Sequence, residues 1–310
     1  SIMPNYQGVW SLSTQFQNRT GWPSPPTIAI FASANGLNTI ETVNIDSAGD
    51  ATDFGDMLAA QSNQAAIGST TRGIIAGGES GGTTNVIQYV TFASPSNATD
   101  FGDLSNNWFH LAGCSSSTRG LFGGGNLGGS TTNTIEYITM ASVGNSTDFG
   151  DLSVIRYALA SSSSPTRGLF LGGYNSTGSA ATNNIDYVTI ASTGNATDFG
   201  DLTANSAVVS SCASSTRALV SPIGFGAGID YVTIASTGNA ADFGDISITY
   251  NRYGAASSNT RGLFAGGNRS GSLTAINSLT IATLGNSSDF GSLATSMSPV
   301  GASSGHGGLQ

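Results

Sequence analysis

The stretch Thr147-Asp-Phe-Gly-Asp151 occurs six times, with small changes, in this chain of 310 residues. Its copies are centred on phenylalanines that lie 44 to 50 residues apart, namely Phe54, Phe101, Phe149, Phe199, Phe243 and Phe290. A period of this length indicates a repeat architecture, in which each unit needs its neighbours to bury a core. We therefore expect one closed, repetitive domain.

The repeat that ends near Phe199 shows what one unit contains. Its pattern predicts strands over 157–161, 167–173, 184–191 and 197–202, separated by turns rich in Gly, Ser and Asn. The third of these alternates apolar and polar residues, as a strand should. Four antiparallel strands in a repeat of about 47 residues are the unit of a β-propeller blade.

The two ends of the chain are predicted to share one blade. Residues 27–35 align with the second strand of the sixth repeat, so the first repeat lacks a first strand of its own. Residues 299–304 resemble the first strand at 253–258 and supply the missing one, which pairs an otherwise exposed edge. The predicted fold is all-β: a six-bladed propeller over 27–310, with one blade closed by strands from both termini.

Residues 1–26 do not match the repeat and form a separate N-terminal segment. The segment ends in a proline cluster, typical of a stiff hinge, and it is rich in aromatic residues. Disordered segments are poor in aromatics, so we expect this one to dock on the propeller or on a partner. The candidate docking residues are Tyr6, Trp10, Phe16 and Trp22.

Charge and cysteine content exclude several classes of function. The net charge is −9 and only 9% of residues are charged, whereas a nucleic-acid partner requires clustered positive charge, so we expect no nucleic-acid partner.

No apolar run approaches the ~20 residues of a membrane span, so we expect no membrane insertion. Cys114 and Cys212 fall at equivalent places in non-adjacent repeats, too far apart for a disulfide, and we expect both to be small buried residues.

The repeated Asp-Phe-Gly-Asp block has three interpretations. The first interpretation is a protein kinase, because Asp-Phe-Gly also forms the metal-binding motif of kinases. A kinase needs a lysine on a strand as well, and the chain has no lysine, which argues against this interpretation. A calcium site is the second, since Asn145, Asp148 and Asp151 bring oxygen ligands together, although their spacing fits no standard calcium loop.

The third interpretation, which we favour, is structural. One arginine recurs in five repeats, as Arg72, Arg119, Arg167, Arg217 and Arg261. We expect it to form a partly buried pair with an aspartate of the block and so to join the strands of a blade. The phenylalanines would pack between blades, and the glycine would permit a bulge.

Residues suited to catalysis are scarce. The chain has two histidines, His110 and His306, and three glutamates, and it contains neither a nucleophile-elbow nor a zinc-protease motif. Two isolated histidines do not make the copper site of a propeller oxidase. We therefore expect no catalytic residue, no metal and no cofactor, and a non-enzymatic protein.

Unrepeated aromatic and polar residues in the loops are the candidate ligand-binding set. We expect the loops between the second and third strands and those between blades to open on the same face of the ring. Aromatic faces flanked by Asn and Arg suit sugar rings, although the same aromatics can instead plug the channel or pack between blades. The candidates are Trp108, His110, Arg156, Tyr157, Tyr174, Tyr250, Arg252 and Tyr253.

Two resemblances bear on identity. A glycine pair ends the second strand in four repeats, as at Gly172-Gly173, and a tyrosine such as Tyr187 follows in the third strand. In these features residues 27–310 resemble the kelch family of propellers. The later kelch tryptophan is absent, and the Asp-Phe-Gly-Asp block stands in its place.

The N-terminal MPNYQGVWSLSTQFQ, together with blades of the type IDYVTIASTGNATDFGDL, resembles kelch-like, tail-fibre-associated structural proteins of tailed bacteriophages, notably marine cyanophages. This resemblance implies a component on the surface of the virion, in the tail or capsid, with other virion proteins as partners. It also implies that the protein can form a homo-oligomer on the particle. We expect the N-terminal segment to anchor it and a propeller face to bind host-surface carbohydrate. The alternatives are a purely architectural decoration protein and, as an outsider, a carbohydrate-active enzyme.

Overall fold

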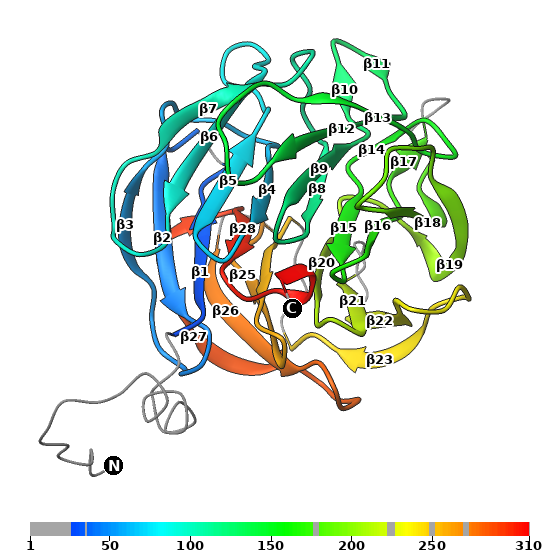
Figure 1. The fold of residues 1–310 in the computed structure, drawn as a ribbon. Coiled ribbons are helices and arrows are strands. Elements are labelled where there is room, and N and C mark those ends of the chain that lie inside the picture. The colour runs from blue at the N-terminus through cyan, green and yellow to red at the C-terminus, as the bar shows by residue number, and fades with distance from the viewer. Residues whose placement is uncertain are drawn as a thin grey trace, which may run out of the picture.

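The structure, a computed structural model, describes residues 26–34, 36–175, 180–221, 227–247, 252–268 and 273–309. Six four-stranded antiparallel sheets surround a central axis and form a six-bladed β-propeller, as the repeat predicts (Figure 1). The candidate docking residues Tyr6, Trp10, Phe16 and Trp22, and the candidate ligand residue Tyr250, lie outside the described residues.

The blades follow one another along the chain. From the innermost strand outward, the first three are β28 (Val300–Ser303), β1 (Ile28–Ala32), β2 (Thr39–Asn44) and β3 (Thr52–Asp56); β4 (Ala65–Gly68), β5 (Arg72–Ala76), β6 (Val86–Thr91) and β7 (Thr99–Asp103); and β8 (Ala112–Ser115), β9 (Arg119–Gly123), β12 (Thr134–Thr139) and β13 (Thr147–Asp151).

The other three blades repeat this order. They are β15 (Ala160–Ser163), β16 (Arg167–Leu171), β18 (Thr182–Thr189) and β19 (Thr197–Ser206); β20 (Ser210–Ala213), β21 (Arg217–Ser221), β22 (Gly228–Thr233) and β23 (Ala241–Asp245); and β24 (Gly254–Ser257), β25 (Arg261–Ala265), β26 (Leu273–Thr280) and β27 (Ser288–Met297).

Closure of the ring is confirmed at the first blade. Strand β28 pairs antiparallel with β1, so that Ala29 lies opposite Ser303 and Ala32 opposite Val300. The blue β1 and the red β28 accordingly lie side by side in Figure 1. Each innermost strand contacts the innermost strands of both neighbouring blades, so the ring has no gap.

The hydrophobic core consists of six clusters, one at each junction between blades. The block phenylalanine contributes to every cluster; Phe101, for example, packs with Leu111 and Phe122 of the following blade. This confirms that the phenylalanines pack between blades. Both cysteines are buried and free, and burial raises the pKa of each thiol to about 12, so neither ionises near neutral pH.

The block glycine makes the predicted bulge and allows the next blade to approach. In all six sheets the register shifts opposite the block; in the third blade the shift lies between Ile135 and Glu136. At Gly150, φ is 143°, and an added Cβ would lie 2.6 Å from the carbonyl oxygen of Gly194 in the next blade. Only glycine fits at this crossing.

Neighbouring blades are joined by main-chain hydrogen bonds and by hydrogen bonds to an asparagine side chain. The loop of each following blade donates a backbone hydrogen bond to the outer strand, as from Ser146 to Asp103, 2.8 Å. Asn145 of the same loop accepts a bond from the backbone N–H of Asp103, 3.0 Å. The same side-chain contact occurs at all six junctions, with Asp50 in the asparagine position at the last one.

The predicted Arg–Asp pairing within the blades is wrong. The five repeated arginines instead donate to a backbone carbonyl in the next blade; Arg167, for example, reaches the oxygen of Ile234 at 2.9 Å. In four blades the guanidinium also lies 4.4 to 4.7 Å from the ring centroid of the blade's own tyrosine. The first aspartate of each block is exposed and the second is half-buried or exposed, so an ion pair there would add little stability.

A C-terminal turn closes one end of the central channel. It consists of His306 and the 3-10 helix η2 (Gly307–Leu309), which lies at the centre of the ring (Figure 1). The imidazole of His306 lies 2.9 Å from the carbonyl oxygen of Gly68 and 3.2 Å from the hydroxyl of Ser115. Both glycines of η2 are buried, and a Cβ added on Gly308 would lie 1.9 Å from the oxygen of Ser115, so the turn packs closely against the end of β8. Within the described part of the chain, no helix is long and apolar enough to cross a membrane.

Candidate functional site at the channel mouth

The loops between blades and the loops between second and third strands meet on one face, as the sequence predicts. In the fourth blade they pair as β14 (Arg156–Tyr157) and β17 (Tyr174–Asn175). A bridge joins Phe109 to Asn126 of the short hairpin β10 (Asn126–Leu127) and β11 (Ser130–Thr131), and another joins Ser62 to Glu79. This face surrounds the open end of the channel, opposite the C-terminal turn.

Five residues with left-handed backbone conformation form what we call the mouth ring. They have φ between 53° and 61° and occupy equivalent positions before the innermost strands: Asn63, His110, Ala158, Val208 and Arg252. Backbone hydrogen bonds link four of them in series, from His110 to Asn63, from Ala158 to His110 and from Val208 to Ala158, at 2.6 to 2.8 Å. Non-glycine residues rarely adopt this conformation, so strain is stored around the opening.

An aromatic row extends outward from the mouth ring. His110 lies between Phe109 and Tyr157, with ring centroids 5.1 and 6.0 Å away, and Tyr157 lies 5.4 Å from Tyr174. All four side chains are half-buried, so each packs against the protein while part of its ring remains accessible to solvent. The structure thus brings together three of the predicted ligand residues, His110, Tyr157 and Tyr174, although they come from three separate loops.

Trp108 lies beside this row and has a structural contact of its own. It is half-buried and packs on the core cluster between the second and third blades. Its indole N–H donates to Glu136 at 3.3 Å, and the same carboxylate accepts a bond from the backbone N–H of Ser105 at 3.0 Å. Trp108 is therefore held at the edge of the face by its polar end.

Two other predicted ligand residues point into the protein and not toward a ligand. The side chain of Arg156 is fully buried and pairs with Asp186 at 2.7 Å, the one ion pair among the described residues. It also donates to the carbonyl oxygens of Phe170, Gly172 and Asn184. Tyr253 is 5% exposed and packs edge-on against Phe264, at a centroid distance of 6.2 Å. Both side chains stabilise the scaffold beneath the face.

The electrostatics of the mouth ring depend on His110, Arg252 and Glu79. Desolvation by burial lowers the pKa of His110 to about 4, with a further lowering by Arg252 and an opposing effect of Glu79. His110 is therefore neutral at pH 7. Arg252 is exposed, and Glu79 accepts a 2.7 Å hydrogen bond from the side-chain amide of Asn63. The ring thus carries one cation and one anion at its rim around a neutral imidazole.

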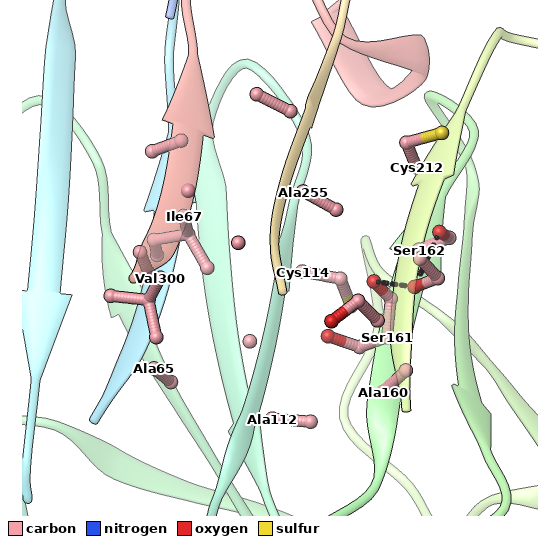
Figure 2. A pocket seen from close by; sticks show the side chains of 18 of the residues that line it. Ala65, Ile67, Ala112, Cys114, Ala160, Ser161, Ser162, Cys212, Ala255 and Val300 are labelled. Atoms are coloured by element: carbon pink, nitrogen blue, oxygen red, sulfur yellow. Dashed lines mark hydrogen bonds between the residues drawn. The ribbon is translucent and has the colours of Figure 1, made fainter. Parts of the chain in front are cut away.

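The mouth ring and the six innermost strands line a cavity of about 210 Å³, seen from close by in Figure 2. Its walls are the six innermost strands, whose side chains are mostly small, such as Ala65, Ala112 and Ser161, with Ile67 and Val300 among the larger ones (Figure 2). The inner edge of each strand has no strand partner and presents backbone N–H and C=O groups to the cavity. His306 lies at the closed end, and burial lowers its pKa as well.

Two buried polar atoms at this cavity have no hydrogen-bond partner. They are the side-chain oxygen of Gln64 and the hydroxyl of Ser298, on residues 3% exposed. Gln64 is oriented by its amide N–H, which donates to the carbonyl oxygen of Ser33 at 2.7 Å. An unpaired buried acceptor is costly, but each oxygen is enclosed by its packed neighbours and a guest in the cavity cannot reach it.

Neither Gln64 nor Ser298 was predicted from the sequence. A second repeated hydrogen-bond contact between neighbouring blades was not predicted either. A buried acid or amide follows the isoleucine of every third strand and accepts from the preceding blade; Asp186, for example, binds the backbone N–H of Ser153 at 3.0 Å. The set is Glu41, Gln88, Glu136, Asp186, Asp230 and Asn277. The sequence does contain a signal for this contact, because a polar residue recurs directly after the isoleucine in the third strand of every repeat.

The arrangement suits binding better than acid–base chemistry. Most buried carboxylates near the face, such as Asp186 and Glu136, are already occupied by donors of the scaffold. Among the described residues, no three His, Cys, Asp or Glu side chains cluster so as to hold a metal ion. No protein-family model matches the chain, and a search of curated proteins found no similar sequence.

Proposed function

We propose that the protein is a non-enzymatic structural component of a bacteriophage virion whose mouth face binds host-surface glycan. The observation that supports binding most strongly is the aromatic row, in which His110, Tyr157 and Tyr174 stand in contact beside an open channel. Half-buried aromatic rings next to polar side chains suit the C–H faces and hydroxyls of sugars. The virion setting rests on the resemblance of the N-terminal stretch and the blades to phage tail-fibre-associated proteins.

The scaffold supports a role in assembly as well as in binding. Every blade junction is joined by main-chain hydrogen bonds and an asparagine or aspartate contact, and five of the six also by an arginine, as expected of a rigid display platform. The N-terminal segment is the proposed anchor to other virion proteins, and copies could also associate on the particle. Loops carry recognition when a rigid scaffold positions them, and this division of labour fits the proposal.

A deletion and a point variant test the two halves of the proposal. We expect a protein lacking residues 1–26 to keep binding a polysaccharide extract of host cells but to be absent from purified particles. Tyr157→Ala should incorporate normally but bind the extract about 10-fold more weakly, because packing of a sugar C–H face on an aromatic ring contributes on the order of 1 kcal/mol or more. Leu284→Ala, an exposed residue in an outer loop, is the control.

The outcomes separate the proposal from its alternatives. A purely architectural protein would show no glycan binding with or without the segment, and deletion would abolish all of its interactions. A carbohydrate-active enzyme would release products from the extract, which chromatography of the reaction would detect. The first result would overturn the proposed glycan-binding role, and the second would overturn the proposed non-enzymatic character.

A further inference from the structure

We propose that Arg252 makes the mouth face selective for glycans that carry an anionic substituent, either a carboxylate or a sulfate ester. The inference rests on the proposed function, because it names the class of sugar that the glycan-binding face accepts. The aromatic row would hold the sugar ring, and the guanidinium of Arg252 would pair with the anionic group beside it.

Arg252 differs from the other described arginines in having no partner within the scaffold. The five repeated arginines donate to backbone carbonyls, and Arg156 pairs with Asp186. Arg252 has neither a hydrogen bond nor an ion pair to any of the described residues, and it is exposed. A guanidinium offers five N–H donors in a planar fork, and two of them can bind the paired oxygens of one anion. Arg252 is therefore free to bind a ligand.

Arg252 is placed where a ligand of the aromatic row would meet it. It belongs to the mouth ring, with φ of 61°, and it is one of the residues that line the cavity. Its charge acts on the imidazole of His110, whose ring centroid lies 6.0 Å from that of Tyr157 in the aromatic row. A sugar that packs on these two rings would thus have its substituents within electrostatic range of the guanidinium.

The charges around Arg252 favour isolated anionic groups on the ligand. Among the described residues that line the cavity there is no aspartate or glutamate. Glu79, whose charge also acts on His110, is half-buried and accepts the hydrogen bond from Asn63. The exposed aspartates of the block lie on the outermost strands, as Asp100 does on β7. They would repel a densely charged polyanion, so the ligand that fits is a glycan with spaced charges.

Binding of charged and neutral forms of the same oligosaccharide by the intact chain tests the proposal. The first pair of probes is oligogalacturonate and its full methyl ester, which differ in the carboxylate. The second pair is a carrageenan oligosaccharide and its desulfated form, which differ in the sulfate. Isothermal titration calorimetry at pH 7 measures each affinity. We expect at least one anionic form to bind about 10-fold more tightly than its neutral counterpart, the effect of one charge-assisted pairing.

Arg252→Asn should abolish this preference without disturbing the fold. Asparagine occupies an equivalent place in the mouth ring at Asn63, with φ of 58°, so the backbone tolerates the change. The anionic form should lose about 10-fold in affinity, while the neutral form should bind as before. Arg252→Lys should keep part of the preference, since lysine retains the charge but not the fork. Leu284→Asp changes the net charge by the same amount at an exposed site in an outer loop, and it should leave the preference intact.

The titration of His110 gives a readout that a purely structural role of Arg252 would not move. The groups that face this imidazole are Arg252, Glu79 and the rings of Phe109 and Tyr157. An anion held by Arg252 offsets the positive charge beside the imidazole, so the pKa of His110 should rise from about 4 when the anionic probe is bound. NMR of the imidazole protons measures this change. A pKa that does not rise would overturn the placement of the anion beside Arg252.

The two proposals fail in different ways. If the members of each pair bind equally well in a Tyr157-dependent way, or if Arg252→Asn keeps the preference, selection by Arg252 is overturned and the glycan-binding face stands. If an anionic form binds through Arg252 but Tyr157→Ala binds it as the wild type does, the anion site stands and the proposed role of the aromatic row falls. Absence of binding to all four probes overturns both.

Discussion

The guanidinium of Arg167 donates a 2.9 Å hydrogen bond to the carbonyl oxygen of Ile234, a residue of the next blade. It also lies 4.7 Å from the ring centroid of Tyr187 in its own blade. One side chain thus joins two sheets, by a charge-assisted bond on one side and a cation–π contact on the other.

Replacement of Arg167 should therefore cost stability through both contacts. We expect Arg167→Ala to lower the free energy of unfolding by about 2 kcal/mol and Arg167→Lys by about 1 kcal/mol, since lysine keeps the charge but loses the planar fork. Urea unfolding followed by fluorescence gives both values. Equal losses for the two variants would contradict a contribution from guanidinium geometry.

Gly150→Ala should be among the most destabilising single changes in the outer strands. An added Cβ would meet the carbon and oxygen of Gly194 at 2.6 Å, and φ is 143°. Gly194→Ala is the matched control, because φ is 155° there but the position is open. We expect a loss of about 3 to 4 kcal/mol for Gly150→Ala and about 1 to 2 kcal/mol for the control, measured by thermal or denaturant unfolding. Similar losses would show that the backbone angle alone matters.

Relief of strain in the mouth ring should stabilise the protein. Val208 is β-branched and has φ of 56°, a conformation that glycine adopts freely. Val208→Gly is expected to raise the free energy of unfolding by about 0.5 to 1 kcal/mol, with a smaller gain for Val208→Asn. Calorimetry measures the shift. A loss of stability in both variants would mean that contacts of the valine outweigh its backbone strain.

Acid should destabilise the fold between about pH 6.5 and pH 4. The pKa of His110 is lowered to about 4 in the folded protein, so below 6.5 the unfolded chain binds a proton that the folded chain does not. The stabilisation is present above pH 6.5 and is lost as the pH falls, by about 2 to 3 kcal/mol for this residue. The lowered pKa of His306 acts in the same direction.

His110→Asn provides the control for this pH dependence. Asparagine tolerates the left-handed conformation of the mouth ring but does not titrate. The variant should show a shallower decline of unfolding free energy from pH 6.5 to 4 than the wild type. Identical profiles would assign the acid sensitivity to other groups.

The closed end of the channel can be tested at Gly308. A Cβ there would lie 1.9 Å from the carbonyl oxygen of Ser115 and 2.6 Å from the hydroxyl of Ser163. We expect Gly308→Ala to displace the C-terminal turn, so that amide hydrogen exchange at His306 and Leu309 becomes faster while the blades stay protected. Unchanged exchange would show that the channel can accommodate the methyl group.

The fold was predictable from the sequence because each blade repeats the same local pattern. The spacing of Phe149 from its counterparts indicated the number of blades, and the match between 299–304 and 253–258 indicated how the ring closes. The bulge at Gly150 followed from the local sequence, and the unpaired cysteines followed from the spacing of the repeats.

The contacts between blades and the exposure of single residues were harder to predict from the sequence. The partner of Arg167 is a backbone carbonyl, which the amino-acid type at position 234 does not reveal. Arg156 was expected on the surface because it lies in a variable loop. Its side chain is instead buried, where it forms an ion pair with Asp186. Gln64 could not be singled out, because an unpartnered oxygen is a property of the packed structure alone.

The sharing of the first blade between β28 and β1 has a consequence for how the protein unfolds. An open stack of repeats has end units, which need special capping and fray first. Here every blade is flanked on both sides, so no unit can peel away while the rest of the array survives. Loss of one junction exposes two apolar faces at once, and we expect melting to be a single all-or-none transition despite the sixfold repetition.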